Sequence, residues 1–164
     1  MSANPAPPVL DAEHAAFIQG GVTISVASRN AALDSSVSRA IGCRVAADRK
    51  RVTLLFAGAV AERLLADIAT CRMIACCFSQ PSTHRTIQLK GADAAIGTPQ
   101  PGDLEIIARQ LDWKVAELVP LGYPEVLVRC VFHGEPDDIV AVTFTPDAAF
   151  AQTPGPNAGR RLSA

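Results

Sequence analysis

The chain has 164 residues, the size of one ordinary domain, and can bury roughly two thirds of the surface that it exposes when unfolded. Its net charge of -1 and isoelectric point near 6.3 exclude the basic surface that binds nucleic acid or an anionic membrane. Charged residues make up 19%, against roughly 25% in typical domains, so we expect part of the surface to be covered in an oligomer.

The five cysteines predict free thiols rather than a metal site or a disulfide framework, because their number is odd and no C-x-x-C spacing occurs. The first residues, MSANPAPPVLD, have neither the basic start nor the apolar stretch of a signal peptide. No apolar run reaches the roughly 18 residues of a membrane span. We therefore expect a cytoplasmic protein with no membrane partner.

The first half of the chain changes between strand and helix patterns. Residues 1–9 are rich in proline and predict an extended arm. Residues 22–28 alternate apolar and polar side chains, as a half-buried strand does, and residues 59–71 carry an apolar helical face. The expected elements after the arm are a helix at 10–21, strands at 22–28, 36–46 and 51–58, and a helix at 59–71.

The second half predicts more strands around one long helix. Residues 72–80 have almost no polar alternation, which is typical of a strand buried on both faces, and residues 83–96 alternate again. Leu104, Ile107 and Leu111 begin an apolar stripe that predicts an amphipathic helix over 103–118. Residues 125–146 predict two strands around a turn at Gly134.

This order predicts a mainly β fold, a six- to seven-stranded antiparallel split barrel with flanking helices, rather than a doubly wound sheet. We expect one domain over residues 10–151. The tail at 152–164 is rich in proline and glycine. It follows the last strand directly, so we expect residues 152–159 to be ordered beside a dimer cleft, with a frayed end as the alternative.

Arg39 and Arg44 are the first candidate ligand contacts. Five residues apart on a regular strand they face opposite sides, but a bulge at Gly42 would bring both to one side, where guanidinium groups bind phosphate well. The alternative is a solvated Arg44 and an ion-paired Arg39 at the rim. The start of the helix at 59–71 is a second candidate, because its free N–H groups and Arg63 favour an anion.

The polar face of THRTIQLK is the third candidate. Thr86 and Gln88 are suited to hydrogen bonds with the edge of a flat polar ring, and a solvent-facing strand is the alternative. No Ser-His-Asp order, paired carboxylates, G-x-G-x-x-G or P-loop occurs, which excludes the usual hydrolase and nucleotide-binding patterns.

Three runs, SRAIGCRVAADRKRVTLLFAG, AVAERLLADIATCR and CCFSQPSTHRTIQLKGAD, resemble the pyridoxamine 5'-phosphate oxidase-like family of FMN-binding split barrels. The ending FAQTPGPNAG is similar to a bacterial branch of that family. The resemblance implies a homodimer with FMN in each of two clefts between the chains. The positions that match its cofactor contacts are Arg39, Ile41, Arg44, Leu55, Phe56, Arg63, Thr86 and Gln88.

Two departures from the family bear on activity. Its Ser-Arg-Lys triplet at a helix start is replaced by Ala61, Glu62 and Arg63, of which only Arg63 is basic. Its substrate-binding Arg and His near the C-terminus are absent, so oxidation of pyridoxamine phosphate is not expected. The resemblance therefore implies an FMN-dependent oxidoreductase acting on another small molecule. The alternatives are a flavin- or haem-binding sensor without turnover and a dimer that has lost its ligand.

Overall fold

The computed structural model describes residues 9–162, so the expected arm at 1–9 lies outside the described residues except for Val9, as do Ser163 and Ala164. The elements in chain order are α1 (Ala12–Ile18), β1 (Thr23–Arg29), β2 (Ser35–Ala40), β3 (Gly42–Val45), β4 (Val52–Ala57), α2 (Gly58–Cys71), β5 (Ile74–Ser79), β6 (Thr86–Gly91), β7 (Ala95–Gly97), α3 (Asp103–Leu118), η1 (Val119–Leu121), α4 (Glu125–Val131), η2 (Pro136–Asp138), β8 (Ile139–Phe144) and β9 (Ala148–Ala151).

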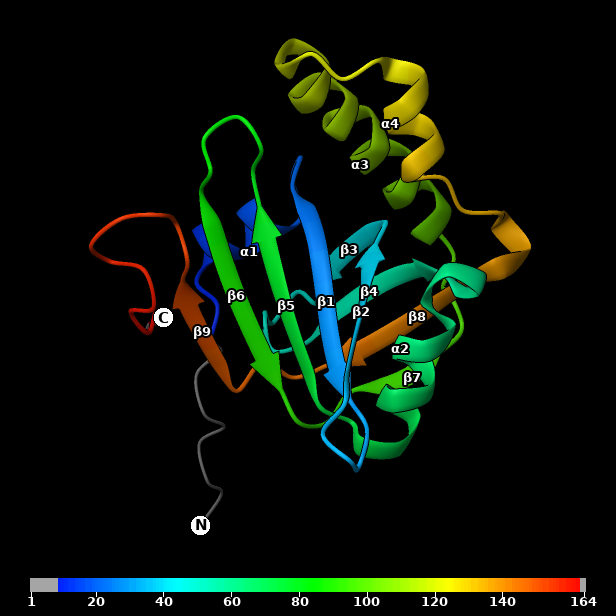
Figure 1. Cartoon of the computed structure of the whole chain (residues 1–164), viewed down its shortest axis with the longest axis vertical. Helices are drawn as coiled ribbons and strands as arrows, with labels where there is room; N and C mark the ends of the chain where they lie inside the picture. The colour runs from blue at the N-terminus through cyan, green and yellow to red at the C-terminus, as the bar shows by residue number, and fades with distance from the viewer. Residues whose placement is uncertain (1–8, 163–164) are drawn as a thin grey trace.

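Two antiparallel sheets make up most of the molecule (Figure 1). One has five strands in the order β2-β1-β5-β6-β9, and the other has four in the order β3-β4-β8-β7. The chain passes from the first sheet to the second at Ile41, between the end of β2 and the start of β3. The fold is thus mainly β with flanking helices, as a split barrel is, and has nine strands within residues 9–162 rather than the expected six or seven.

The main core lies between the sheets. Ile24, Leu54 and Phe78 are fully buried there, because alternate side chains of each strand point inward. Helix α2 contacts β1 and β2 of one sheet and β4 and β7 of the other, so it packs across the opening between them. Its apolar residues Leu64 and Ile68 join the same core.

Helix α3 covers the outer side of the four-stranded sheet, where Ile107 packs against Leu55 and Ile41. Its buried residues are Asp103, Ile107, Gln110 and Lys114, so Ile107 is the one member of the expected apolar stripe that is buried. Leu104 of that stripe is 45% exposed. The reason is that β3 is an edge strand, whose free backbone groups need polar partners that α3 supplies.

The segment expected as a strand after residue 125 is helix α4, so that assignment was wrong. Short apolar runs fit either structure, and here the helical spacing of Val128 and Phe132 buries both residues. An ion pair between Arg129 and Glu125, four residues apart and 2.7 Å between Nε and Oε1, supports the helix. Helices α3 and α4 form a hairpin that projects beyond one end of the sheets (Figure 1).

The C-terminal segment folds back along its own chain. Gln152 N donates to Thr86 O over 2.8 Å, and Gly159 N donates to Ala151 O over 2.7 Å. Leu162 N bonds to Ala149 O, and the Leu162 side chain packs against the main core. Residues 152–162 therefore lie against β6 and β9. No helix among residues 9–162 is long and apolar enough to cross a membrane.

Candidate functional site

The outer face of the five-stranded sheet carries a row of aligned side chains, one from each strand. Strand register places Arg39 opposite Ser25, Ser25 opposite Cys77, Cys77 opposite Gln88, and Gln88 opposite Phe150. Adjacent strands lie about 4.8 Å apart, so the row runs straight across the sheet. We call this outer face, with these five residues as its central row, the platform.

The platform is flat at its centre and basic. In the next row, Ala27 and Ala75 lie between Val37 and Lys90, so small side chains form the floor. The five strands contribute three charged residues to this face, namely Arg29 of β1, Arg39 of β2 and Lys90 of β6. None of these five strands contains Asp or Glu, so the platform attracts anions although the chain as a whole has a net charge of -1.

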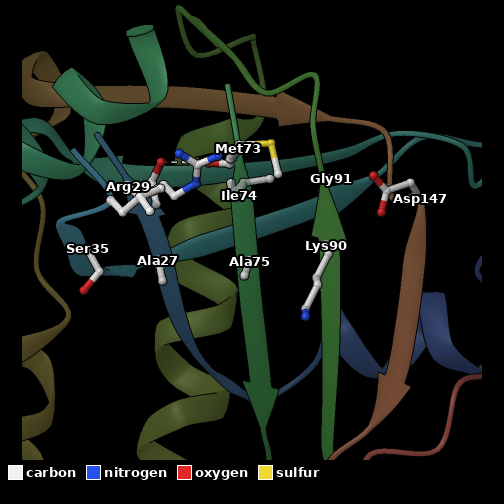
Figure 2. Close-up of a pocket in the computed structure, with 11 residues that line it drawn as sticks. Ala27, Arg29, Ser35, Met73, Ile74, Ala75, Lys90, Gly91 and Asp147 are labelled. Atoms are coloured by element: carbon white, nitrogen blue, oxygen red, sulfur yellow. Dashed lines mark hydrogen bonds between the residues drawn. The ribbon is translucent and has the colours of Figure 1, made fainter. Parts of the chain in front are cut away.

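A hollow of about 420 Å³ lies at the Lys90 end of the platform. Ala27, Ala75 and Gly91 line its floor, and Figure 2 shows Arg29 and Asp147 among the residues around it. This hollow is open and mostly apolar, with charged groups at its margin.

A smaller groove of about 240 Å³ lies at the opposite end, where the α3–α4 hairpin overhangs β1 and β2. The Arg39 guanidinium lies 5.1 Å from the centre of the Phe132 ring at this groove. Arg39 is the only charged residue in the groove lining, which otherwise consists of Thr23, Leu118, Tyr123, Leu127, Val128, Val131 and Phe132. No ion pair among residues 9–162 involves Arg39, so its charge is available to a ligand.

Arg44 has a partner within the chain. Its Nε lies 2.8 Å from Oδ1 of Asp103, whose side chain is 1% exposed. Asp103 begins α3, and Leu118, at the far end of that 16-residue helix, lines the groove with Arg39. Because such a helix is about 24 Å long, the two arginines lie near opposite ends of it and do not contact one phosphate together. The expected pairing through a bulge at Gly42 is not formed.

The start of α2 is likewise bonded to a carboxylate of the chain itself, that of Asp138. Ala59 N donates to both carboxylate oxygens of Asp138, over 3.2 Å to Oδ1 and 3.0 Å to Oδ2. Gly58 permits this approach, because a Cβ at that position would lie 2.8 Å from Asp138 Oδ1. The helix start that was expected to hold a phosphate is thus capped by the chain's own carboxylate.

The other predicted contacts divide between the core and the surface. Ile41, Leu55 and Phe56 are buried by the chain itself, and Arg63 is exposed on α2. Thr86 and Gln88 lie half-buried on the platform, as the polar alternation of their strand indicates. The structure therefore brings Arg39, Thr86 and Gln88 to one face and places the other five elsewhere.

Lys114 is a buried charged group that the sequence did not indicate. Its Nζ lies 3.4 Å from Ile41 O and 5.4 Å from the centre of the Phe132 ring, on which Arg39 also packs. Burial lowers the pKa of this amine to about 8. Its position outside the apolar stripe of α3 gave no sign of burial, because the packing of that face depends on the edge of β3.

No protein-family model and no curated protein sequence matches the chain. Solved structures do match it. HupZ of Group A Streptococcus is 15% identical with a TM-score of 0.54, covering 92% of this chain and 99% of that chain. A candidate pyridoxamine 5'-phosphate oxidase of Lactobacillus delbrueckii is 12% identical with a TM-score of 0.52, covering 87% and 93%.

HutZ, described as the haem storage protein of Vibrio cholerae, is 12% identical with a TM-score of 0.50, covering 87% of this chain and 94% of that chain. At such identities these likenesses concern the fold alone. The chain has the fold of the pyridoxamine 5'-phosphate oxidase-like split barrels, which matches the resemblance found in its sequence.

Proposed function

We propose that this protein binds a planar, anionic cofactor on the platform, between two copies of the chain. The observation that carries the proposal is the central row, in which the unpaired cation Arg39 is aligned with the neutral hydrogen-bonding groups of Ser25 and Gln88. A flat ring lying on Ala27 and Ala75 would meet those groups at its edge. None of the five strands carries a carboxylate, and the one carboxylate in the lining of the hollow, that of Asp147, lies at its margin.

The surroundings of the platform support a second copy as the cover. Val37 and Leu33 are each 70% exposed beside the floor, and Leu127 of the overhanging α4 is 48% exposed. Apolar side chains gathered on one face are typical of an interface. A homodimer formed through this face would exclude water from a ring ligand and supply its second wall.

FMN is the first candidate cofactor, because the resemblance in sequence implies it. A bound flavin would supply electron transfer to or from a small molecule, which would make the protein an oxidoreductase. In this chain Gln88, Thr86 and Ser25 would orient the ring edge and Arg39 would contact the phosphate. The rest of the expected phosphate cradle does not fit, since Arg44 and the start of α2 are bonded to Asp103 and Asp138.

Haem is the second candidate. The carboxylates of Asp103 and Asp138 favour it, because they occupy the groups that would otherwise bind the phosphate of FMN. A haem carries carboxylates rather than a phosphate, and one arginine suffices for one carboxylate. On this alternative the protein stores or senses its ligand without turnover. Bound flavin that neither NADH nor NADPH reduces, alone or with a reductase, would also favour a binding role.

An absorption spectrum of the purified protein, followed by titration with FMN and with haemin, tests the proposal. We expect one of the two to bind and Arg39→Ala to weaken it by about tenfold or more, the worth of a charge-assisted hydrogen bond. Arg109→Ala is the matched control, because Arg109 also packs over an aromatic ring, that of Trp113 at 5.5 Å, but on α3. Colourless protein that binds neither ligand would refute the proposed function.

A further inference from the structure

We infer that Lys114 and the groove beside Arg39 form a covalent binding site for a small apolar aldehyde, which the amine holds as an imine. The inference goes beyond the proposed ring site and does not rest on it, because Lys114 belongs to α3 and not to the strands of the platform. Three features carry it: a buried amine with a single weak partner, an aromatic ring shared by the amine and the groove, and an apolar groove of small volume.

The amine of Lys114 is buried without an anion. The side chain is 1% exposed, and its Nζ donates to Ile41 O over 3.4 Å. An ammonium group has three N–H donors, so two of them have no acceptor among residues 9–162. No ion pair of the described residues involves Lys114 either. Burying a charge with so little compensation is unfavourable, which favours the neutral, nucleophilic form of the amine.

The Phe132 ring is the wall that the amine shares with the groove. Nζ of Lys114 lies 5.4 Å from the ring centre, and the same ring lines the groove, where the Arg39 guanidinium lies 5.1 Å from it. Phe132 follows the last residue of α4, so its backbone lies at the end of the helix and not within it. Rotation of this one side chain would open Nζ to the groove.

The groove suits a small apolar molecule. Its volume of about 240 Å³ is below the roughly 300–1,000 Å³ that is typical of sites for drug-sized ligands. Aliphatic side chains make up much of the lining, namely Leu118, Leu127, Val128 and Val131. Leu118 comes four residues after Lys114 on α3, so the two side chains share one face of that helix.

Imine formation at Lys114 needs neither an oxidant nor a reductant. The lone pair of neutral Nζ attacks the carbonyl carbon and forms a C–N bond, and the carbonyl oxygen then leaves as water with the two protons of the amine. Burial lowers the pKa of Lys114 to about 8, although the neighbouring Cys43 thiol acts in the opposite direction. At pH 7 the neutral fraction of such an amine exceeds that of an ordinary exposed lysine by roughly two orders of magnitude.

Reductive trapping of the full-length protein with butanal and cyanoborohydride tests the inference, because hydride transfer to the imine fixes it as a stable amine. The chain has two further lysines, Lys50 and Lys90, which serve as internal references. Peptide mapping by mass spectrometry compares the labelling rates of the three at pH 7. We expect Lys114 to be labelled about tenfold or more faster than the others, although it is the most buried of the three. A purely structural lysine predicts the reverse order.

Variants of the groove show whether the aldehyde reaches Lys114 through it. Leu127→Trp fills the groove and should slow the labelling of Lys114 severalfold. Val126→Trp is the matched control, because Val126 is 77% exposed and lies outside the groove lining. Phe132→Leu keeps an apolar side chain but reduces the wall, so labelling should become faster. Circular dichroism and thermal unfolding verify that each variant is folded.

The outcomes separate this inference from the proposed function. Lys114→Arg should abolish the preferred adduct, and Lys50→Arg should retain it. Labelling of Lys50 and Lys90 ahead of Lys114, or equal slowing by the two tryptophan variants, would overturn the inference. Protein that binds neither FMN nor haemin but is labelled first at Lys114 would refute the proposed function and leave this inference standing.

Discussion

The side-chain amide of Gln110 bonds to both backbone groups of Cys43. Its Oε1 accepts from Cys43 N over 2.9 Å, and its Nε2 donates to Cys43 O over 2.7 Å. Cys43 lies on β3, at the edge of the four-stranded sheet, so Gln110 provides the hydrogen bonds that a further strand would make. Helix α3 is therefore attached to the sheet by polar contacts as well as by Ile107.

Replacing Gln110 with alanine should lower the free energy of unfolding by about 2–4 kcal/mol. The change leaves a buried N–H and a buried C=O without partners, each of which costs about 1–3 kcal/mol. Urea unfolding at unchanged m-value measures the loss. Gln100→Ala is the control, because Gln100 is exposed and contributes only its backbone N–H and C=O to the described contacts. Equal stability of the two variants would contradict the edge-closing role.

Arg39 and Arg44 were expected to bind one ligand together. We now expect Arg44 to contribute to stability and Arg39 to ligand binding. Arg44→Met breaks its ion pair with buried Asp103 and should destabilise the protein by about 2 kcal/mol, less than for a fully buried pair because Arg44 is 25% exposed. Arg39→Met should change stability by less than about 0.5 kcal/mol. Arg39→Met should weaken the binding of a ring ligand more than Arg44→Met does. A loss of binding in correctly folded Arg44→Met would return Arg44 to the site.

Lys114 should make stability depend on pH in alkaline solution. Burial lowers its pKa from 10.5 to about 8, so between these values the unfolded chain binds more protons than the folded chain. The destabilisation from burying the charged amine is therefore complete below pH 8, and stability rises as the pH increases from 8 toward 10.5. Buried Cys43, whose pKa is raised to about 12 by burial, acts in the opposite direction above its usual value of 9.0.

Both proteins keep Cys43, so the difference between wild type and Lys114→Met reports chiefly on the lysine, together with the effect of its charge, which lowers the pKa of the Cys43 thiol. We expect the variant to be more stable at pH 7 by about 1 kcal/mol or more, because it removes a poorly paired buried amine. The difference should shrink as the pH is raised from 8 to 10. Lys50→Met, in the turn between β3 and β4, should show no such trend. A pH-independent difference would mean that Lys114 titrates normally.

Gly91 should be required at the end of β6. A Cβ there would lie 2.7 Å from Phe144 Cδ2 and 2.9 Å from Thr145 O, and the backbone oxygen cannot move aside easily. Gly91→Ala should thus cost about 2 kcal/mol. Gly97 on β7 has open space at the same position, so Gly97→Ala should be near neutral. Thermal or urea unfolding compares them, and a stable Gly91→Ala would show that the sheets can separate locally.

The class of fold and the polar face of β6 could be predicted from the order of residues along the chain. Strict alternation at Thr86 and Gln88 specifies which side chains leave the core, because the period of a strand is fixed at two residues. The helical spacing of apolar residues likewise predicted α2 and α3 as helices. These features depend only on neighbours along the chain, which is why they could be predicted.

Other features depended on neighbours in space, and the sequence misassigned them. Residues 125–131 have an apolar pattern that fits a strand or a helix, and only the burial of Val128 where α4 contacts α3 decides for the helix. The buried polar stripe of α3 follows from the open edge of β3. Nothing in the helix itself distinguishes Gln110 from a solvated residue.

The tertiary structure also separated residues that the sequence had assigned to one site. Arg39 and Arg44 are five residues apart in sequence, yet the passage between sheets at Ile41 sends one to the platform and the other to Asp103. The row that joins Arg39 to Gln88 exists only through the register of four strands. Local sequence set which residues could bind an anion, whereas strand order and ion pairing decided which one remains free to do so.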